Sequence, residues 1–311
     1  MFQIGLRAHD YGTKVSPEKL ADILVPYRPA SIQLALAKAL TGVPGPGGLS
    51  PGYARAIRKI FEERGISIAV LGCYINPVHP DAEAREKQLR RFEEHLRYAR
   101  DFGCSLVGTE TGSCNGDCSF HPDTEKPETF DLFCRSLERL IKTAEKCGSI
   151  VAIEAVADQH TVSSIEKMRA VLSRLASPSL KVIYDPVNLI PQAGLLESGL
   201  FQSQKDFFAQ AFAAFGDDIA AVHAKDFRMD PEANAAVKIG TLPAGTGELD
   251  YPSLLSLIAE RKPGIDILLE NSSPDTGKQA IAFLREWGSS GNLRKVKLTP
   301  DSPLPTPNSP I

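Results

Sequence analysis

The sequence predicts a single closed barrel of eight parallel strands, each followed by a helix, which is the (β/α)₈ fold. Eight short apolar or β-branched segments alternate with longer segments of helical periodicity, a pattern that indicates parallel strands joined by helical crossovers. The length of 311 residues suits one such barrel, since these domains run from about 200 to more than 400 residues. An open doubly wound sheet is the alternative, but so many regular repeats favour closure. We expect the barrel to occupy residues 1–290.

The predicted strands share a run of apolar or β-branched residues that ends in a polar or glycine-rich stretch. In chain order they are FQIGLRA (2–8), ASIQLAL (30–36), ISIAVLG (66–72), CSLVGTE (104–110), SIVAIEA (149–155), LKVIYDP (180–186), DIAAVHAKD (218–226) and IDILLEN (265–271).

The predicted helices follow these strands and carry recognisable start and stop signals. The segment 16–24 begins with Ser16 as a cap and Pro17 in the first turn, which supplies the acceptor that a helix start lacks. The longest segment, 79–103, has apolar residues at steps of three and four and is expected to end at Gly103. Further helical segments are 127–148, 163–175, 204–215, 251–262 and 273–287.

The C-terminal stretch 291–311 differs from the rest of the chain in composition. It has four prolines in its final eleven residues and no apolar period, so it cannot contribute a packed element. We interpret it as an irregular tail outside the barrel.

Composition and charge exclude several classes of function. Lys plus Arg total 35 against 38 for Asp plus Glu, giving a formal charge of −3, so no excess of positive charge is present to bind nucleic acid. No segment reaches the roughly 18 apolar residues needed to span a membrane, and the first residues do not resemble a secretion signal. We therefore expect a cytoplasmic protein with no nucleic-acid or membrane partner. Neither a dinucleotide fingerprint nor a phosphate loop of the Gly-Lys-Ser type is present.

Six cysteines lie between Cys73 and Cys147, too few in a chain of this length for a disulfide scaffold, and we expect them to be reduced. Cys114 and Cys118 are spaced loosely for zinc, and no second close pair follows. An ordinary polar loop is the favoured interpretation of this segment.

Four successive predicted strands end in a polar side chain. These residues are Glu154, Asp185, His223 and Glu270, and each pair in sequence is separated by one strand and one helix. The active sites of (β/α)₈ barrels lie at the C-terminal ends of the strands. Since side chains alternate along a strand, inward placement of Glu154 and His223 also directs Ala152 and Ala221 inward, where small apolar residues are acceptable.

Three carboxylates and an imidazole at one mouth predict a single divalent metal ion. A lone strand-end Glu or Asp is more often a helix cap or an ion-pair partner, but four that converge would repel one another without a cation at their centre. Oxygen-rich ligands with one nitrogen favour Mn²⁺ or Mg²⁺, with Co²⁺ and Zn²⁺ as alternatives.

The chain resembles the xylose-isomerase-like TIM barrels over about residues 1–290. This family includes sugar phosphate isomerases, ketose epimerases, hydroxypyruvate isomerase, inosose dehydratase and apurinic-site endonucleases. The motifs that carry the resemblance are VAIEAV (151–156), VIYDPVN (182–188), AVHAKDFR (221–228), LPAGTGELDYPSLL (242–255), ILLENS (267–272) and the long helix with its lead-in (76–103).

The resemblance implies that Glu154, Asp185, His223 and Glu270 match the family's metal quartet, with Glu154 and Glu270 also acting as acid and base. It implies an isomerase or epimerase that acts on a small ketose or related carbohydrate through a metal-bound enediolate, because a metal that bridges a carbonyl and its neighbouring hydroxyl acidifies the C–H between them. The alternative is an inosose- or dehydroshikimate-type dehydratase on the same quartet. A non-catalytic barrel that binds a sugar is a third reading, against which the acid and base residues argue.

One departure from the family pattern narrows the activity. The epimerases and the three-zinc endonucleases carry Asp, two residues and then His on the sixth strand, whereas this chain has Asp185 followed by Asn188. No histidine follows His223, so a trinuclear zinc site cannot form from the family positions. Abasic-site cleavage is therefore disfavoured, and membership of the known ketose epimerase subgroup is in doubt.

The remaining polar residues near the predicted strand ends are candidates for binding substrate. They are Asn188, Lys225, Arg228, Glu110, Asn76, Gln33 and His9. Lys225 and Arg228 suit an oxyanion, although Lys225 could instead pair with a neighbouring carboxylate and Arg228 could be solvated. Gly245 and Gly247 are expected to set loop geometry. A homo-oligomer, dimer or tetramer, is compatible with these features.

Overall fold

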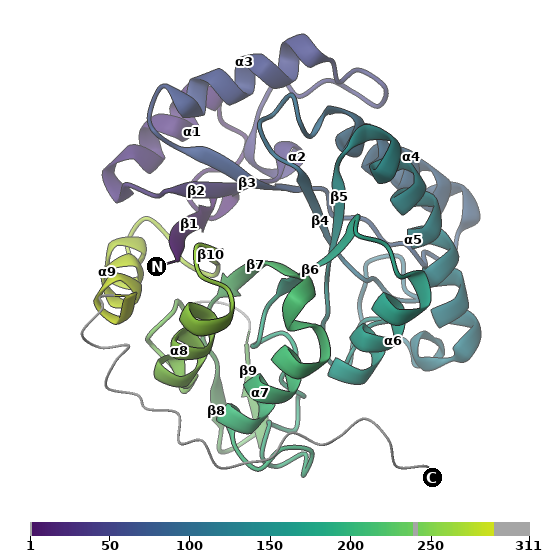
Figure 1. The fold of residues 1–311 in the computed structure, drawn as a ribbon, viewed down its shortest axis with the longest axis vertical. Helices are drawn as coiled ribbons and strands as arrows, with labels where there is room; N and C mark the ends of the chain where they lie inside the picture. The colour runs from purple at the N-terminus through teal and green to yellow at the C-terminus, as the bar shows by residue number, and fades with distance from the viewer. Residues whose placement is uncertain (1, 239–241, 289–311) are drawn as a thin grey trace.

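The computed structural model describes residues 2–238 and 242–288 and shows a closed barrel of eight parallel strands (Figure 1). The neighbours around the barrel are β1-β10-β7-β6-β5-β4-β3-β2. The strands are β1 (Gln3–Arg7), β2 (Ser31–Leu34), β3 (Ser67–Gly72), β4 (Leu106–Glu110), β5 (Ile150–Glu154), β6 (Leu180–Tyr184), β7 (Ile219–Ala224) and β10 (Asp266–Leu269). The predicted fold and all eight predicted strands are confirmed, and the open sheet is excluded.

Helices surround the barrel on its outer side (Figure 1). They are α1 (Pro17–Leu24), α2 (Leu36–Ala39), α3 (Pro51–Glu62), α4 (Ala82–Tyr98), α5 (Pro127–Cys147), α6 (Ile165–Leu175), α7 (Gln204–Phe215), α8 (Tyr251–Arg261) and α9 (Gly277–Gly288), with 3₁₀ turns at η1 (Ala8–Asp10), η2 (Val25–Tyr27), η3 (Pro122–Glu125) and η4 (Gly216–Asp218). The Ser16 hydroxyl accepts a hydrogen bond from the backbone N–H of Lys19 at 3.2 Å, as the cap prediction requires.

Two details of the helices differ from the prediction. The long helix α4 ends at Tyr98, earlier than expected, and Gly103 terminates the turns that follow it with a φ of 77°. The helix α3, between β2 and β3, was not specified from the sequence. Among the described residues no helix is both long and apolar enough to cross a membrane. The predicted tail, 291–311, lies outside the described residues.

The residues that pack the barrel interior lie on the same strand faces as the metal-ligand candidates. A small buried cluster fills the interior and consists of Val70, Ala152, Ile183, Ala221 and Leu268. The last four of these stand two residues before Glu154, Asp185, His223 and Glu270 respectively. Because side chains repeat every two residues along a strand, the strands that pack the interior also direct all four polar side chains into the mouth, and the inward placement of Ala152 and Ala221 is confirmed.

An antiparallel hairpin that the sequence did not reveal interrupts the regular repeat after β7. It consists of β8 (Arg228–Asp230) and β9 (Ala235–Val237), paired from Arg228↔Val237 to Asp230↔Ala235. The backbone N–H of Ala236 donates to the carbonyl of Gln192 at 2.8 Å. This bond ties the hairpin to the loop that follows β6.

The loop between the hairpin and α8 is fixed by the buried carboxylate of Asp226. Its Oδ1 accepts hydrogen bonds from the backbone N–H groups of Phe227 and Leu249, at 3.0 and 2.9 Å, and its Oδ2 accepts from that of Gly245 at 3.0 Å. Gly247 passes so close to this arrangement that a Cβ there would lie 2.2 Å from the Phe227 carbonyl oxygen and 2.5 Å from Asp226 Oδ1. Gly247 therefore sets the loop geometry by the close approach it permits.

We predict that Gly247→Ala lowers the free energy of unfolding by about 1–3 kcal/mol, because the new methyl group meets backbone that cannot move aside easily. Gly45→Ala is the matched control, since no atom lies within 4 Å of a Cβ at that position. Urea denaturation of both variants and the parent protein measures the effect. Equal stability of the two variants would contradict the close approach seen at Gly247.

Candidate metal centre

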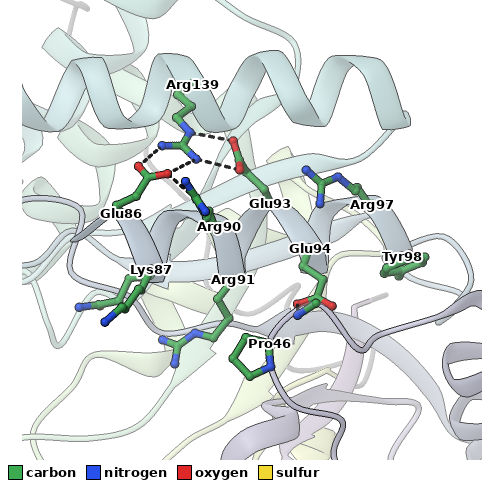
Figure 2. Close-up of a pocket in the computed structure, with 12 residues that line it drawn as sticks. Pro46, Glu86, Lys87, Arg90, Arg91, Glu93, Glu94, Arg97, Tyr98 and Arg139 are labelled. Carbon is green, nitrogen blue, oxygen red and sulfur yellow. Dashed lines mark hydrogen bonds and ion pairs between the residues drawn. The ribbon is translucent and has the colours of Figure 1, made fainter. Parts of the chain in front are cut away.

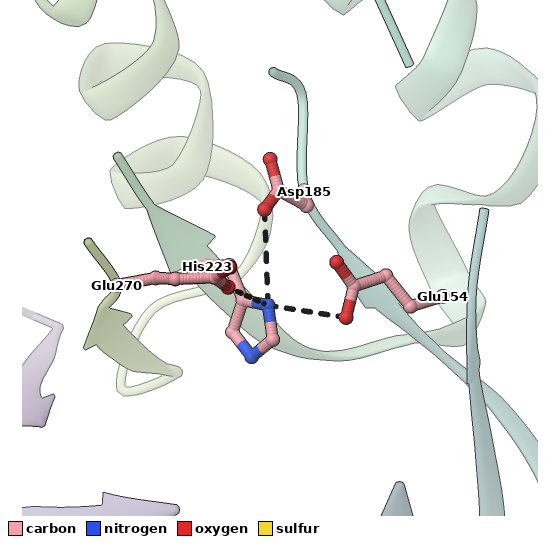
Figure 3. A group of neighbouring side chains, drawn as sticks. All are labelled: Glu154, Asp185, His223 and Glu270. Carbon is pink, nitrogen blue, oxygen red and sulfur yellow. Dashed lines mark ion pairs between the residues drawn. The ribbon is translucent and has the colours of Figure 1, made fainter. Parts of the chain in front are cut away.

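Four side chains from neighbouring strands converge at the mouth of the barrel (Figure 3). Glu154 is the last residue of β5, Asp185 follows β6 directly, His223 lies in β7 and Glu270 follows β10. One ligand atom from each lies within 4.8 Å of the others. All four residues are buried, with exposed fractions between 1% and 7%.

The Nδ1 atom of His223 lies at the centre of three carboxylates (Figure 3). It is 3.0 Å from Glu270 Oε2, 3.2 Å from Glu154 Oε2 and 3.8 Å from Asp185 Oδ2. Within the described part of the chain, this nitrogen is buried without a hydrogen-bond partner of acceptable geometry, and Asp185 Oδ2 has only its ion pair with Lys225 Nζ. Buried polar atoms seldom lack a partner, and a divalent cation would satisfy both. The donor set, oxygen-rich with one imidazole nitrogen, therefore fits a metal ion.

Gln33 on β2 orients the imidazole of His223. Its Oε1 lies 2.6 Å from His223 Nε2, and its Nε2 donates to the hydroxyl of Tyr74 at 2.9 Å. Because the amide oxygen can only accept, Nε2 carries the imidazole proton in this contact. Once the second ring proton is displaced, the lone pair of Nδ1 would face the carboxylates, as a metal ligand requires. The structure thus places Gln33, a predicted substrate-binding residue, behind the histidine.

Asn188 fixes two of the carboxylates. Its backbone N–H donates to Asp185 Oδ1 at 3.0 Å, and its side-chain amide donates to Glu154 Oε1 at 2.6 Å. The residue that replaces the histidine of the family pattern therefore holds the quartet in place. It also lines a cavity beside Glu270, and its contact with substrate stays a prediction.

Two cations compensate the buried carboxylates. Lys225 Nζ lies 2.9 Å from Asp185 Oδ2 and 3.0 Å from Glu270 Oε1, and Arg7 Nη1 lies 2.6 Å from Glu270 Oε1. The Lys225 pairing matches the alternative in which this lysine contacts a neighbouring carboxylate. Arg7 was missed, although it ends the first strand and the same strand-end rule could have identified it.

These charges shift the ionisation of the cluster. Burial alone would lower the pKa of His223, but Glu154 and Glu270 outweigh burial and raise the pKa to about 10. Burial would raise the pKa of Glu270, but Lys225, His223 and Arg7 together hold it well below its usual range. Burial, followed by the neighbouring glutamates, raises the pKa of Asp185 despite the opposing charge of Lys225. Without a metal the proton on His223 partly neutralises the carboxylates, and a metal ion would take its place.

A cavity of about 260 Å³ lies at the mouth beside Glu270, the one member of the quartet among its lining residues, and we call it the inner chamber. Its lining includes Arg7, Glu110, Asn188, Lys225 and Glu270. Burial and the nearby Glu270 raise the pKa of Glu110. Glu110 is therefore a predicted residue that the structure brings to the site.

Two histidines near the mouth are held neutral by their surroundings. His160 lines the chamber with its Nδ1 3.8 Å from Glu110 Oε2, and burial lowers its pKa to about 4. The sequence had suggested only a loop or surface role for it. His9 packs its ring edge-on to Tyr74, with centroids 6.0 Å apart, and burial lowers its pKa to about 3.

Four predicted substrate-binding residues are not among the described residues that line the chamber: His9 and Gln33, placed above, and Asn76 and Arg228. The side-chain amide of Asn76 donates to the carbonyls of Ser113 and Asn115, both at 2.8 Å, and so ties loops together. Arg228 is exposed at the start of β8, because the unforeseen hairpin carries it away from the strand ends.

A separate hollow of about 810 Å³ lies outside the barrel, along α4 and beside α5 (Figure 2). Arg139 spans it, pairing with Glu86 and Glu93 at 2.5 and 2.8 Å. Its described lining has five basic residues (Lys87, Arg90, Arg91, Arg97 and Arg139) and three acidic ones (Glu86, Glu93 and Glu94), and none belongs to the quartet. We therefore assign the chemistry of this protein to the barrel mouth.

The fold and the quartet define a (β/α)₈ barrel with a cluster able to hold a metal ion. The chain belongs to the xylose isomerase-like TIM barrel family, whose model matches residues 32–287. No curated protein sequence matches the chain.

Solved structures share the fold at low sequence identity. A D-tagatose 3-epimerase-like protein is 15% identical with a TM-score of 0.69, covering 95% of this chain and 100% of its own. A xylose isomerase-like TIM barrel protein from Mycobacterium smegmatis in complex with magnesium is 16% identical with a TM-score of 0.67, covering 95% and 97%. The probable 3-DHS dehydratase AsbF from Bacillus anthracis is 14% identical with a TM-score of 0.65, covering 92% and 99%.

We predict that Gln33→Leu weakens Mn²⁺ binding by about 10–100-fold, the usual cost of losing a residue that orients a metal-ligating histidine. Gln33→Glu keeps an acceptor for His223 Nε2 and should retain most of the affinity. Isothermal titration calorimetry with Mn²⁺ measures both variants. If Gln33→Leu binds Mn²⁺ as tightly as the parent protein, the orienting role is wrong.

Proposed function

We propose that this protein is a metal-dependent isomerase or epimerase of a small ketose or related carbohydrate, which moves a proton through an enediolate. The observation that carries the proposal is the position of two glutamates on different sides of one centre. Glu154 and Glu270 approach His223 Nδ1 from β5 and β10, strands that β6 and β7 separate in the barrel (Figure 3). Epimerase-like proteins among the structures that share this fold agree with it.

The metal ion would be held by Glu154, Asp185, His223 and Glu270, and when bound it would polarise the substrate carbonyl and acidify the neighbouring C–H. The carboxylate-rich ligand set favours Mn²⁺ or Mg²⁺, and the magnesium complex of the Mycobacterium smegmatis protein is consistent with this choice.

The chain's own residues then move the proton. One glutamate takes it from the carbon beside the carbonyl, and the electron pair moves onto the carbonyl oxygen. Return of a proton by the other glutamate to the opposite face restores the carbonyl and inverts that carbon. Return of the proton to the former carbonyl carbon isomerises the sugar, provided that the neighbouring hydroxyl passes its proton to the former carbonyl oxygen and becomes the new carbonyl. Arg7 and Lys225 lie beside Glu270 and line the chamber, where they would stabilise negative charge that develops on the substrate oxygen.

A dehydratase is the second candidate, and Glu110 is the observation that favours it. This carboxyl lines the inner chamber, and burial raises its pKa, so it could protonate a departing hydroxyl after the first proton is removed. A probable dehydratase among the structures that share the fold supports this candidate.

We predict that Glu154→Gln and Glu270→Gln each lower turnover by about 10²- to 10⁴-fold, the usual contribution of general acid–base catalysis. The amide keeps an oxygen for the metal but cannot accept the proton at neutral pH, so metal occupancy should fall less than activity. Asp185→Ala should instead lose metal and activity together. Steady-state kinetics and elemental analysis of the same preparations separate the two behaviours.

We also predict that solvent deuterium enters the carbon beside the carbonyl during turnover in D₂O, because the proton passes through a carboxyl group that exchanges with solvent. Ketoses, inososes and hydroxypyruvate are suitable substrates for the screen, and mass spectrometry reads the product. A product formed without deuterium would indicate hydride transfer between carbons and reject the two-glutamate mechanism. A product lighter than its substrate by one water would identify the dehydratase.

A further inference from the structure

We propose that the natural substrate is a glycoside whose reacting sugar occupies the inner chamber and whose second sugar ring lies in an adjoining outer cavity against Phe120. This inference rests on the proposed sugar chemistry at the quartet and specifies its substrate class.

The two cavities adjoin and share part of their lining. The outer cavity has a volume of about 830 Å³ against about 260 Å³ for the inner chamber. Four residues, Val156, Gln159, Asn188 and Lys238, line both. Ligand pockets usually measure roughly 300–1,000 Å³, so the inner chamber is small for a ligand and the two together suit a larger one. A substituent on a sugar bound in the inner chamber would extend either past these shared residues into the outer cavity or directly into solvent.

The walls of the outer cavity are built by four loops at the mouth of the barrel, of which the loop after β4 contributes Phe120. The loop after β5 contributes residues 156–159, the loop after β6 contributes Gln192 and Ala193, and the hairpin contributes residues 233–236. The bond from Ala236 N–H to the Gln192 carbonyl joins two of the walls, and Gln192 N–H also donates to Asp158 Oδ2. The side-chain amide of Asn271 donates to the Lys238 carbonyl at 3.1 Å, which anchors the end of the hairpin to the loop after β10.

The chemistry of this lining suits a carbohydrate ring. Phe120 is 63% exposed and lines the cavity, and an aromatic face left open to solvent is a ready surface for the C–H face of a sugar. Alanines at 157, 193, 233, 235 and 236 keep the walls shallow and apolar, while the amides of Gln159, Gln192 and Asn234 offer groups that can bond hydroxyls. Apolar walls with a few polar groups are the usual composition of a specific ligand site.

Lys238 stands at the junction of the two cavities. Its Nζ donates to the backbone carbonyl of Ile190, and among the described residues it forms no ion pair with a carboxylate. An ammonium group has three donors, so the remaining ones can reach the oxygen that links the two rings or a hydroxyl next to it. The junction thus has a polar contact where a glycosidic link would cross.

The test compares free ketoses with disaccharides that end in a ketose, using the full chain loaded with Mn²⁺. Calorimetric affinities are measured for D-fructose and D-tagatose, and for maltulose, isomaltulose and lactulose, which are fructose units that carry a second hexose. We expect at least one disaccharide to bind about tenfold more tightly than the free ketoses. Phe120→Ala, which removes the stacking surface, and Ala193→Trp, which fills the outer cavity, should each reduce this preference severalfold.

Leu200→Ala and Leu200→Trp are matched controls, because Leu200 is 66% exposed and is not among the described residues that line either cavity. Both should keep the preference of the parent protein. The inference is overturned if no disaccharide binds more tightly than the free ketoses, or if the variants of Phe120 and Ala193 bind them all with the parent's preference.

Solvent deuterium exchange, measured on the same sugars, separates this inference from the proposed function. Exchange into the sugars without any preference for disaccharides would retain the proton-transfer chemistry and reject the second-ring site. Preferential binding of a disaccharide without exchange at any carbon would retain the second-ring site and reject the proton-transfer chemistry.

Discussion

The burial of three carboxylates around one imidazole is the constraint on which the mouth of this barrel depends. Uncompensated, such charges would cost several kcal/mol each to remove from water. The surrounding residues offset that cost. Lys225 and Arg7 supply positive charge, and Asn188 donates hydrogen bonds to two of the carboxylates. Even so, His223 Nδ1 has no hydrogen-bond partner of acceptable geometry within the described chain. The ligand atoms of the four residues lie within 4.8 Å of one another, which suits one shared cation.

The barrel interior and the site are consequences of the same alternation along the strands. Ala152, Ile183, Ala221 and Leu268 fill the centre, and each precedes a ligand candidate by two residues. A shift of one residue in the pairing of β5 or β7 would send both the filling residue and the ligand candidate to the outer face. The packing that stabilises the barrel therefore also determines which side chains face the substrate, and the fold could be predicted together with the quartet.

The sequence was less informative where a side chain's role depends on partners far away along the chain. Gln33 contacts His223, which lies 190 residues further along the chain. Its position at a strand end predicted that Gln33 lies at the mouth, but not that its amide oxygen would contact the histidine. Arg7 also ends a strand but was overlooked, because a charged residue at the end of the first strand is commonly a solvent-exposed surface residue. The sequence could not show that the side-chain amide of Asn76 donates to two carbonyls of a later loop.

The hairpin of β8 and β9 shows why the substrate is the hardest feature to read from such a chain. Its strands have three residues each and no apolar alternation, so no sequence pattern predicts them. For this reason Arg228 was expected near the ends of the barrel strands. Yet this insertion forms one wall of the outer cavity, and the hydrogen bond from Ala236 to Gln192 closes it against the loop after β6. The strands determine where a proton can be taken and returned, while loops with little sequence signal determine how large a molecule can reach them. A barrel of this kind can therefore keep its quartet and change its substrate by altering a wall such as this hairpin.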